Sequence, residues 1–208
     1  MGFTAQDVAA AVMRAKARMD TLEQELNAAD AKLGDGDTGG MLARVLGKLA
    51  AQDVGAAADV GSAFGALARA AAQATGSSLG TLFATALLAA SKATKGTTEV
   101  HWGALQGILN AAKEAMMGRG GASIGDKTVV DSLDAVADAI EGVCDLHEIR
   151  TKTVAAARDV LERLRDKPCR VGRARMFAEK SVGIDDPGML AFARLAEAIA
   201  EKDPEPAA

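Results

Sequence analysis

The chain has 208 residues, a formal net charge of −4 and only 3% aromatic residues, none of them tyrosine. This length suits one domain over residues 1–208, and the acidic balance leaves no basic face for nucleic acid. Alanine and leucine are abundant whereas strand-forming residues are scarce, so we expect an all-α fold.

Clusters of glycine, aspartate and serine divide the chain into segments of helical composition. We predict helices over residues 4–29, 38–52, 56–75, 79–94, 102–118, 126–143, 147–166, 170–181 and 187–201. Thr4 or Asp7 can cap the first helix, and Thr38 can cap the second. The short connections favour antiparallel neighbours around one core. We expect a disordered tail from about residue 202.

The sequence indicates neither export nor membrane insertion. Residues 1–7 lack the charged and apolar segments of a secretory signal, and the most apolar run, residues 80–90, is too short to span a bilayer. Cys144 and Cys169 are far apart and lack the spacing of a metal site. We read them as two thiols in a reducing compartment and expect a cytoplasmic protein.

The loop of residues 34–39 has two interpretations. Its letters match G-x-G-x-x-G, the dinucleotide loop, but that loop must follow a buried strand, and residues 23–33 have helical composition. Asp35 and Asp37 would also repel a bare phosphate. Asp30 lies about one and a half helical turns earlier and can contribute a third oxygen. Three carboxylates suit Mg²⁺, so we expect a metal-and-phosphate loop; the alternative is a solvated turn.

Three further loops combine glycine with aspartate, serine or threonine: residues 75–80, 118–128 and 183–188. Helices joined up and down place every second connection at the same end, so these loops can form one polar rim. The simpler alternative is that the glycines only cap helices. Residues 120–128 read as a Walker A loop with one aspartate too many, and they follow a helix. We read Asp126 as a helix cap.

Five motifs in these loops follow the order found in a known family. They are Asp30…Gly34-Asp35-Gly36-Asp37-x-Gly39, Gly76…Gly80-x-Leu82-Phe83, Gly125-Asp126-Lys127-Thr128-x-x-Asp131, Gly172-Arg173-Ala174 and Glu179-Lys180-Ser181-Val182-Gly183-x-x-Asp186-Pro187-Gly188. Through them the chain resembles the nucleotide-binding L subunit of dihydroxyacetone kinase, the Dak2 domain. The resemblance implies an antiparallel eight-helix barrel with the nucleotide in the loops at one end.

The resemblance also implies which residues form the site. Asp30, Asp35 and Asp37 would hold a pair of Mg²⁺ ions that bridge to the phosphates of ADP or ATP. The implied nucleotide contacts are Thr38, Gly39, Gly40, Met41, Ser78, Leu79, Gly120, Val129, Arg173, Asp186, Pro187 and Gly188. Thr38 stands where the family usually has histidine, and Leu79 replaces a serine. Ile124 replaces a common proline and Ala178 a common glycine, which suggests a divergent branch.

The sequence shows no pair of a base and a nucleophile, because His101 and His147 lie outside the glycine loops. We therefore assign no catalytic residue. The resemblance implies a triose or tetrulose kinase in which a K-type partner subunit holds the sugar covalently. The donor would be ATP, or a phosphotransferase-system protein that rephosphorylates bound ADP. The alternatives are a regulatory nucleotide-binding module that docks a partner protein, or the nucleotide domain of another kinase such as fatty-acid kinase.

Overall fold

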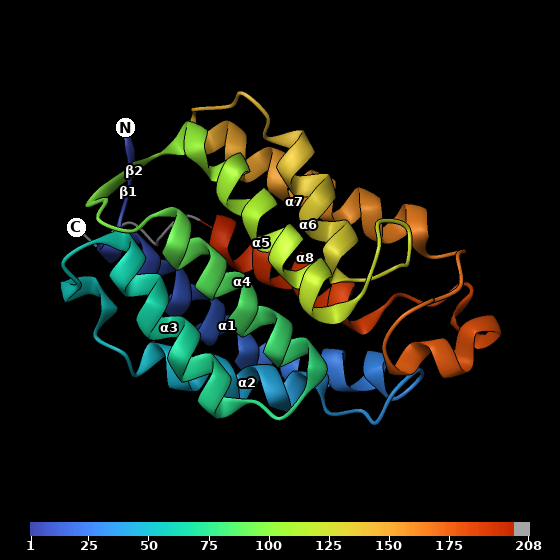
Figure 1. Ribbon diagram of the computed structural model, residues 1–208. Helices are drawn as coiled ribbons and strands as arrows, with labels where there is room; N and C mark the ends of the chain where they lie inside the picture. Colours follow the sequence, from blue (N-terminus) through green and yellow to red (C-terminus); the bar gives the residue numbers. More distant parts are fainter. Residues whose placement is uncertain (202–208) are drawn as a thin grey trace, which may run out of the picture.

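The computed structural model describes residues 1–201, except for the side chains of Arg173 and Phe177. This part of the chain contains eight α-helices (Figure 1). They are α1 (Ala5–Asp30), α2 (Thr38–Ala50), α3 (Val60–Ala74), α4 (Ser78–Ala93), α5 (Leu105–Gly120), α6 (Val129–Ala139), α7 (Leu146–Leu164) and α8 (Pro187–Ala200). The expected all-α fold is confirmed. The tail from residue 202 lies outside the described residues.

Short elements connect these helices. They are the 3₁₀ helices η1 (Val54–Ala56), η2 (Trp102–Ala104) and η3 (Arg173–Ser181), and the strands β1 (Gly2–Thr4) and β2 (Glu99–His101). The two strands form an antiparallel pair in which Phe3 lies opposite Val100. The sequence did not predict this pair, because three residues are too few to reveal an alternating pattern.

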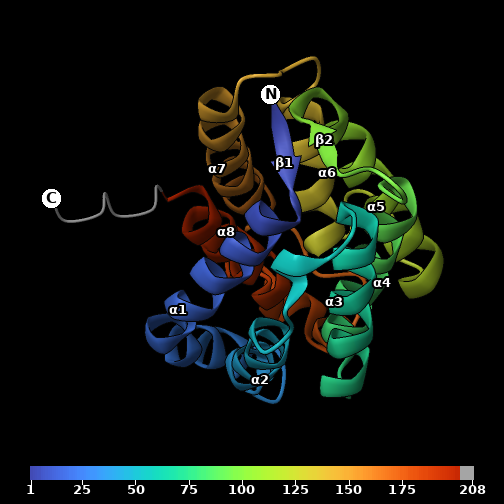
Figure 2. The same ribbon diagram turned by 90° about the vertical axis from the view of Figure 1, so that its left-hand side faces the viewer.

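The eight helices form a closed up-and-down barrel. Each helix packs against the next one in the chain, and α8 packs against α1, as the views in Figures 1 and 2 show. An ion pair between Arg194 of α8 and Glu25 of α1 spans this closing contact at 2.8 Å. Because the helices alternate in direction, the α1–α2, α3–α4, α5–α6 and α7–α8 connections lie at one end. We call this end the loop end; it carries all four glycine loops.

Side-chain caps determine where several helices begin. Thr4 and Asp7 form a capping box at the start of α1, and Thr128 and Asp131 form another at the start of α6. The prediction that α6 begins at residue 126 with Asp126 as its cap was wrong. Lys127 has a φ of 62°, which is outside the helical range, so the helix begins only after Thr128.

The predicted helix over residues 170–181 was also wrong. This segment forms the 3₁₀ helix η3, which follows Gly172 with a φ of 74°. Of the side chains that the structure describes there, only Ala174 and Ser181 are buried. An α-helix gains most of its stability in a protein by burying an apolar face, and the described side chains of this segment do not form such a face.

Small residues allow the helices to approach closely. Ala63, Ala71 and Ala157 are completely buried beside larger core residues such as Leu26. The abundant alanine of the sequence therefore serves close helix packing rather than merely helix propensity. None of the helices within residues 1–201 combines the length and the apolar character that crossing a lipid bilayer requires.

Candidate metal and nucleotide site

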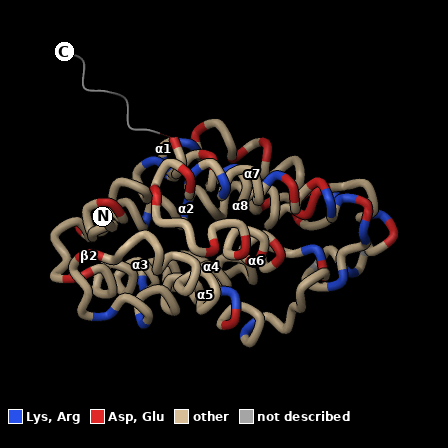
Figure 3. Tube along the Cα trace, turned by 90° about the horizontal axis from the view of Figure 1, so that it is seen from above, with Lys and Arg blue, Asp and Glu red and all other residues tan. Residues whose placement is uncertain are grey.

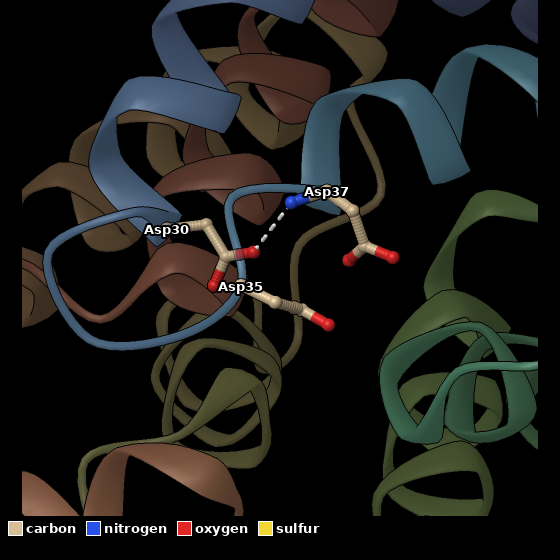
Figure 4. A group of neighbouring side chains, drawn as sticks. All are labelled: Asp30, Asp35 and Asp37. Carbon is tan, nitrogen blue, oxygen red and sulfur yellow. Dashed lines mark hydrogen bonds between the residues drawn. The ribbon is translucent and has the colours of Figure 1, made fainter.

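Three carboxylates converge at the loop end, where α1 leads into α2 (Figure 4). Asp30, Asp35 and Asp37 each have a ligand oxygen, and these oxygens all lie within 4.8 Å of one another. Asp30 is the buried last residue of α1, whereas Asp35 and Asp37 are exposed. Carboxylates this close repel one another unless a cation lies between them. The all-oxygen set fits a hard divalent ion such as Mg²⁺.

The glycines of the loop make this convergence possible. A Cβ on Gly34 would lie 2.3 Å from Oδ1 of Asp30, so only glycine leaves room for that carboxylate. Gly36 has a φ of 76°, a left-handed conformation that glycine adopts at little cost. Together they turn the chain back within a few residues, which brings Asp35 and Asp37 to the end of α1.

Side chains from α1 cap the start of α2. Asp30 Oδ2 accepts hydrogen bonds from the N–H groups of Asp37 at 3.0 Å and Thr38 at 3.2 Å. Oδ1 of Asn27 accepts from Gly39 at 2.8 Å and Gly40 at 3.1 Å. The first amides of α2, which a helix leaves unpaired, are thereby satisfied. The Asp37 carboxylate makes no capping bond of its own, so it is available to a metal.

This arrangement changes two expectations. Thr38 was predicted to cap α2 with its side chain, but the caps come from Asn27 and Asp30 instead. Sequence reasoning missed Asn27, although it lies three residues before Asp30 and therefore on the same face of α1. Because the amides of residues 38–40 are engaged, we expect phosphate to be held there through metal ions rather than by these amides.

A second group of expected contacts meets at the starts of α4, α6 and α8. A Cβ on Gly188 would lie 3.5 Å from Cδ1 of Leu79 and 3.7 Å from Cβ of Val129. Leu79 and Phe192 pack against the small core cluster that contains Val129. The structure thus brings together three residues that are far apart in the sequence. We call this contact the apolar junction; Leu79 and Gly188 are partly exposed in it, whereas Val129 is buried.

The remaining expected contacts have different surroundings. The side chain of Met41 is only 2% exposed and belongs to the core, and Pro187 is buried as the first residue of α8. Ser78 is exposed at the start of α4, where its neighbour Ser77 provides the cap. A Cβ on Gly120 would lie 3.1 Å from Cδ2 of Leu82, so Gly120 adjoins α4. The side chain of Arg173 lies outside the described part of the structure.

The segment between α7 and α8 brings positive charge to the loop end. Residues 163–180 contain seven Lys and Arg residues but only two Asp and Glu residues, in a chain of net charge −4. Figure 3 shows basic positions, with acidic positions beside them, at the end of the molecule away from the N-terminus. A basic segment at the same end as the carboxylate cluster favours a ligand that is itself anionic, such as a metal-bound phosphate.

Asp186 is a half-buried carboxylate at the start of α8. Its side chain accepts a hydrogen bond from the N–H of Met189 at 2.9 Å and so caps the helix. Burial raises the pKa of Asp186 to about 6, although this hydrogen bond and the positive charge of Lys127 act in the opposite direction. Folding therefore disfavours the ionised form of the Asp186 carboxyl group relative to its protonated form.

We expect Asp186→Asn to stabilise the nucleotide-free protein above about pH 6. The pKa of Asp186 in the folded state exceeds its ordinary value of 3.8, so ionisation destabilises the fold as the pH rises between these values. Asparagine keeps the cap without the charge. The gain should be of the order of 2 kcal/mol near neutral pH and should vanish below about pH 4. Urea unfolding at several pH values measures it.

Asp59→Asn is the matched control, because Asp59 caps α3 in the same way. Hydrogen bonds from Ser62 lower the pKa of Asp59, so its ionised form stabilises the fold. Its replacement should therefore not increase stability at neutral pH. A loss of stability at neutral pH in Asp186→Asn would contradict the expectation.

Comparisons with known proteins agree with this geometry. Residues 32–201 match the DAK2 domain family. The chain is 36% identical over 184 residues to L-erythrulose 1-kinase of Mycolicibacterium smegmatis, a match that covers 86% of this chain and 32% of that enzyme. It is 30% identical over 181 residues to the ADP-binding subunit DhaL of the PTS-dependent dihydroxyacetone kinase of Lactococcus lactis, which covers 85% of this chain and 86% of that subunit.

A solved structure has the same fold. The dihydroxyacetone kinase of C. freundii in complex with AMP-PNP and Mg²⁺ matches with a TM-score of 0.69 and 24% identity, over 96% of this chain and 34% of that one. The chain therefore spans about a third of the length of these larger kinases and most of the length of the Lactococcus subunit. By the match over residues 32–201, the chain belongs to the DAK2 domain family.

Proposed function

We propose that this chain binds Mg²⁺ and an adenine nucleotide as one subunit of a dihydroxyacetone-type kinase that phosphorylates a triose or tetrulose. The observation that carries the proposal is the convergence of Asp30, Asp35 and Asp37 at the loop end of the barrel. The names of two similar proteins support this proposal. One is an ADP-binding subunit of a dihydroxyacetone kinase, and the other was solved with AMP-PNP and Mg²⁺.

Each part of the loop end would have its own task in phosphoryl transfer. Such reactions depend chiefly on positioning and on neutralising the phosphate charge, which bound Mg²⁺ would supply. Asp30, Asp35 and Asp37 would hold the metal, and the bonds from Asn27 and Asp30 to α2 keep those carboxylates in place. Leu79, Val129 and Gly188 would contact the nucleoside.

The sugar would come from a partner. Both histidines lie at the opposite end of the barrel, His101 in β2 and His147 in the first turn of α7. Neither can reach a phosphate held by the carboxylates of the α1–α2 loop. A K-type subunit that docks on the loop end would supply the sugar and its covalent anchor. The phosphoryl donor would be ATP or, as the name of the Lactococcus relative suggests, a phosphotransferase-system protein acting on bound ADP.

The test reconstitutes the reaction. The purified chain is mixed with a candidate K-type subunit and offered dihydroxyacetone, D-erythrulose or L-erythrulose. The donor is either Mg-ATP or phosphoenolpyruvate with phosphotransferase-system proteins. We expect sugar phosphate, followed by ³¹P NMR, only when both subunits and one donor are present. Tight Mg-nucleotide binding without turnover from either donor would instead favour a regulatory module.

A further inference from the structure

Lys127 is a lysine with no access to solvent. It is 1% exposed, and its Nζ donates hydrogen bonds to the carbonyl oxygens of Arg165 at 2.8 Å, Lys167 at 2.9 Å and Ser181 at 2.7 Å. An ammonium group has three hydrogens to donate, so these bonds use all of them. Lys127 is therefore not available to a phosphate, unlike the lysine of a Walker A loop.

The three carbonyl groups belong to one segment. We call residues 165–186, which connect α7 to α8, the arm. Arg165 and Lys167 begin the arm and Ser181 lies near its end, so the ammonium joins both ends of the arm to the α5–α6 loop. Two backbone bonds reinforce this junction: the N–H of Gly183 donates to the carbonyl of Arg165 at 2.9 Å, and that of Arg170 donates to Asp126 at 3.2 Å.

The arm also contacts the loop that carries the carboxylates. Cys169 and Ala174 of the arm form a buried cluster with Leu33 of the α1–α2 loop, and Ile184 packs against it. The N–H of Cys169 donates to the hydroxyl of Ser181 at 2.8 Å, inside the arm. The arm ends at Asp186, the cap of α8, so the position of the arm sets where α8 begins relative to Val129.

We infer that Lys127 is a positioning residue for the nucleotide: its ammonium fixes the arm and the start of α8 against the start of α6. The inference rests on the proposed function. Removing the ammonium would take one donor from each of these three carbonyl groups and would cut the bonds that tie them to the α5–α6 loop. The carbonyls of Arg165 and Ser181 would keep the N–H groups of Gly183 and Ile184, whereas that of Lys167 would lose its bond to Lys127. The arm would then open, and the apolar junction of Leu79, Val129 and Gly188 would lose its shape. The hydrogen bonds that hold Asp30 against the start of α2 involve no residue of the arm, and Leu33 is the link between the arm and the carboxylate loop.

The test compares nucleotide binding, which would depend on the arm, with metal binding, which would depend on the carboxylate cluster. Lys127→Met keeps most of the side-chain volume but removes the ammonium. We expect its dissociation constant for Mg-ADP, measured by calorimetry, to rise at least about tenfold. Its affinity for Mn²⁺ alone, measured by electron paramagnetic resonance, should stay within about twofold of the wild-type value. Amide hydrogens of residues 165–183 should exchange faster.

Lys113→Met is the matched control. Lys113 of α5 is also largely buried, and its ion pair is with Asp134 of α6 at 2.7 Å, outside the arm. It should leave the affinity for Mg-ADP and for Mn²⁺ unchanged. A Lys127→Met protein that exchanges faster in the arm yet binds Mg-ADP normally would overturn the inference. So would an equal loss of Mn²⁺ affinity, which would show general unfolding.

A second variant covers the case in which Lys127→Met does not fold. Ser181→Ala removes the hydroxyl that accepts a hydrogen bond from the N–H of Cys169. It therefore weakens a contact within the arm and leaves Lys127 in place. It should lower affinity for Mg-ADP but not for Mn²⁺, and unchanged affinity with faster exchange in the arm would again overturn the inference. If the wild-type chain binds Mn²⁺ but does not bind Mg-ADP, both the proposed function and this inference are overturned.

Discussion

Replacing Asp35 and Asp37 together by asparagine is expected to lower the affinity for Mg-ADP at least about 100-fold. Asparagine keeps the size of each side chain but removes two of the three negative charges that would hold the metal. Both side chains are exposed, and Asp37 makes no capping bond, so the fold should persist. Without metal the three carboxylates repel one another, so the variant should melt no lower than the wild type in EDTA. Calorimetry with Mg-ADP and a thermal melt measure both effects.

The matched control is Asp20→Asn with Asp53→Asn. It changes the net charge by the same amount at two exposed positions, one along α1 and one beside η1 at the opposite end of the barrel. This control should bind Mg-ADP as the wild type does. An equal loss in both double variants would mean that overall charge, and not the carboxylate cluster, governs binding. Unchanged affinity in the first variant would eliminate the metal site altogether.

The parts of the fold that the sequence predicted are those with local signals. Eight of the nine expected helices are present in the described residues, because each contains helix-forming residues in sufficient length between glycine or aspartate clusters. The convergence of the carboxylates was also predictable. Asp30, Asp35 and Asp37 lie within eight positions of one another, and a helix end followed by a glycine-rich turn limits how far apart they can be.

The parts that the sequence did not predict depend on distant contacts. The carbonyl groups that bind Lys127 lie 38 to 54 residues away, so nothing near residue 127 indicates a buried ammonium. The cap that Asn27 provides to Gly39 and Gly40 likewise joins two helices. Local patterns suggested caps from Thr38 and Asp126 instead. The first error arises where a tertiary contact replaces the local hydrogen bond that propensity favours. The second arises because another local cap, the capping box of Thr128 and Asp131, begins α6 two residues later.

Replacing Gly39 by alanine is expected to destabilise the protein by about 3 kcal/mol. A Cβ on Gly39 would lie 2.1 Å from the carbonyl oxygen of Glu23 and 2.9 Å from Oδ1 of Asn27. The carbonyl belongs to the backbone of α1 and cannot rotate away, so α1 and α2 would have to separate. Separation would also break the cap from Asn27 and move Asp37 away from Asp30. We therefore expect weaker Mn²⁺ binding together with lower stability in urea unfolding.

Gly40→Ala is the matched control, because it makes the same change one residue later in α2. There the nearest atom to a Cβ is Oε1 of Glu23 at 3.6 Å, at the end of a flexible side chain. Alanine is also the better helix former by about 1 kcal/mol, so this variant should be as stable as the wild type or slightly more stable. Equal stability of the two variants would contradict the close approach of α1 and α2 beneath the carboxylates. A stable Gly39→Ala protein with weak Mn²⁺ binding would show that the helices can separate at little cost, and that the metal site alone requires their contact.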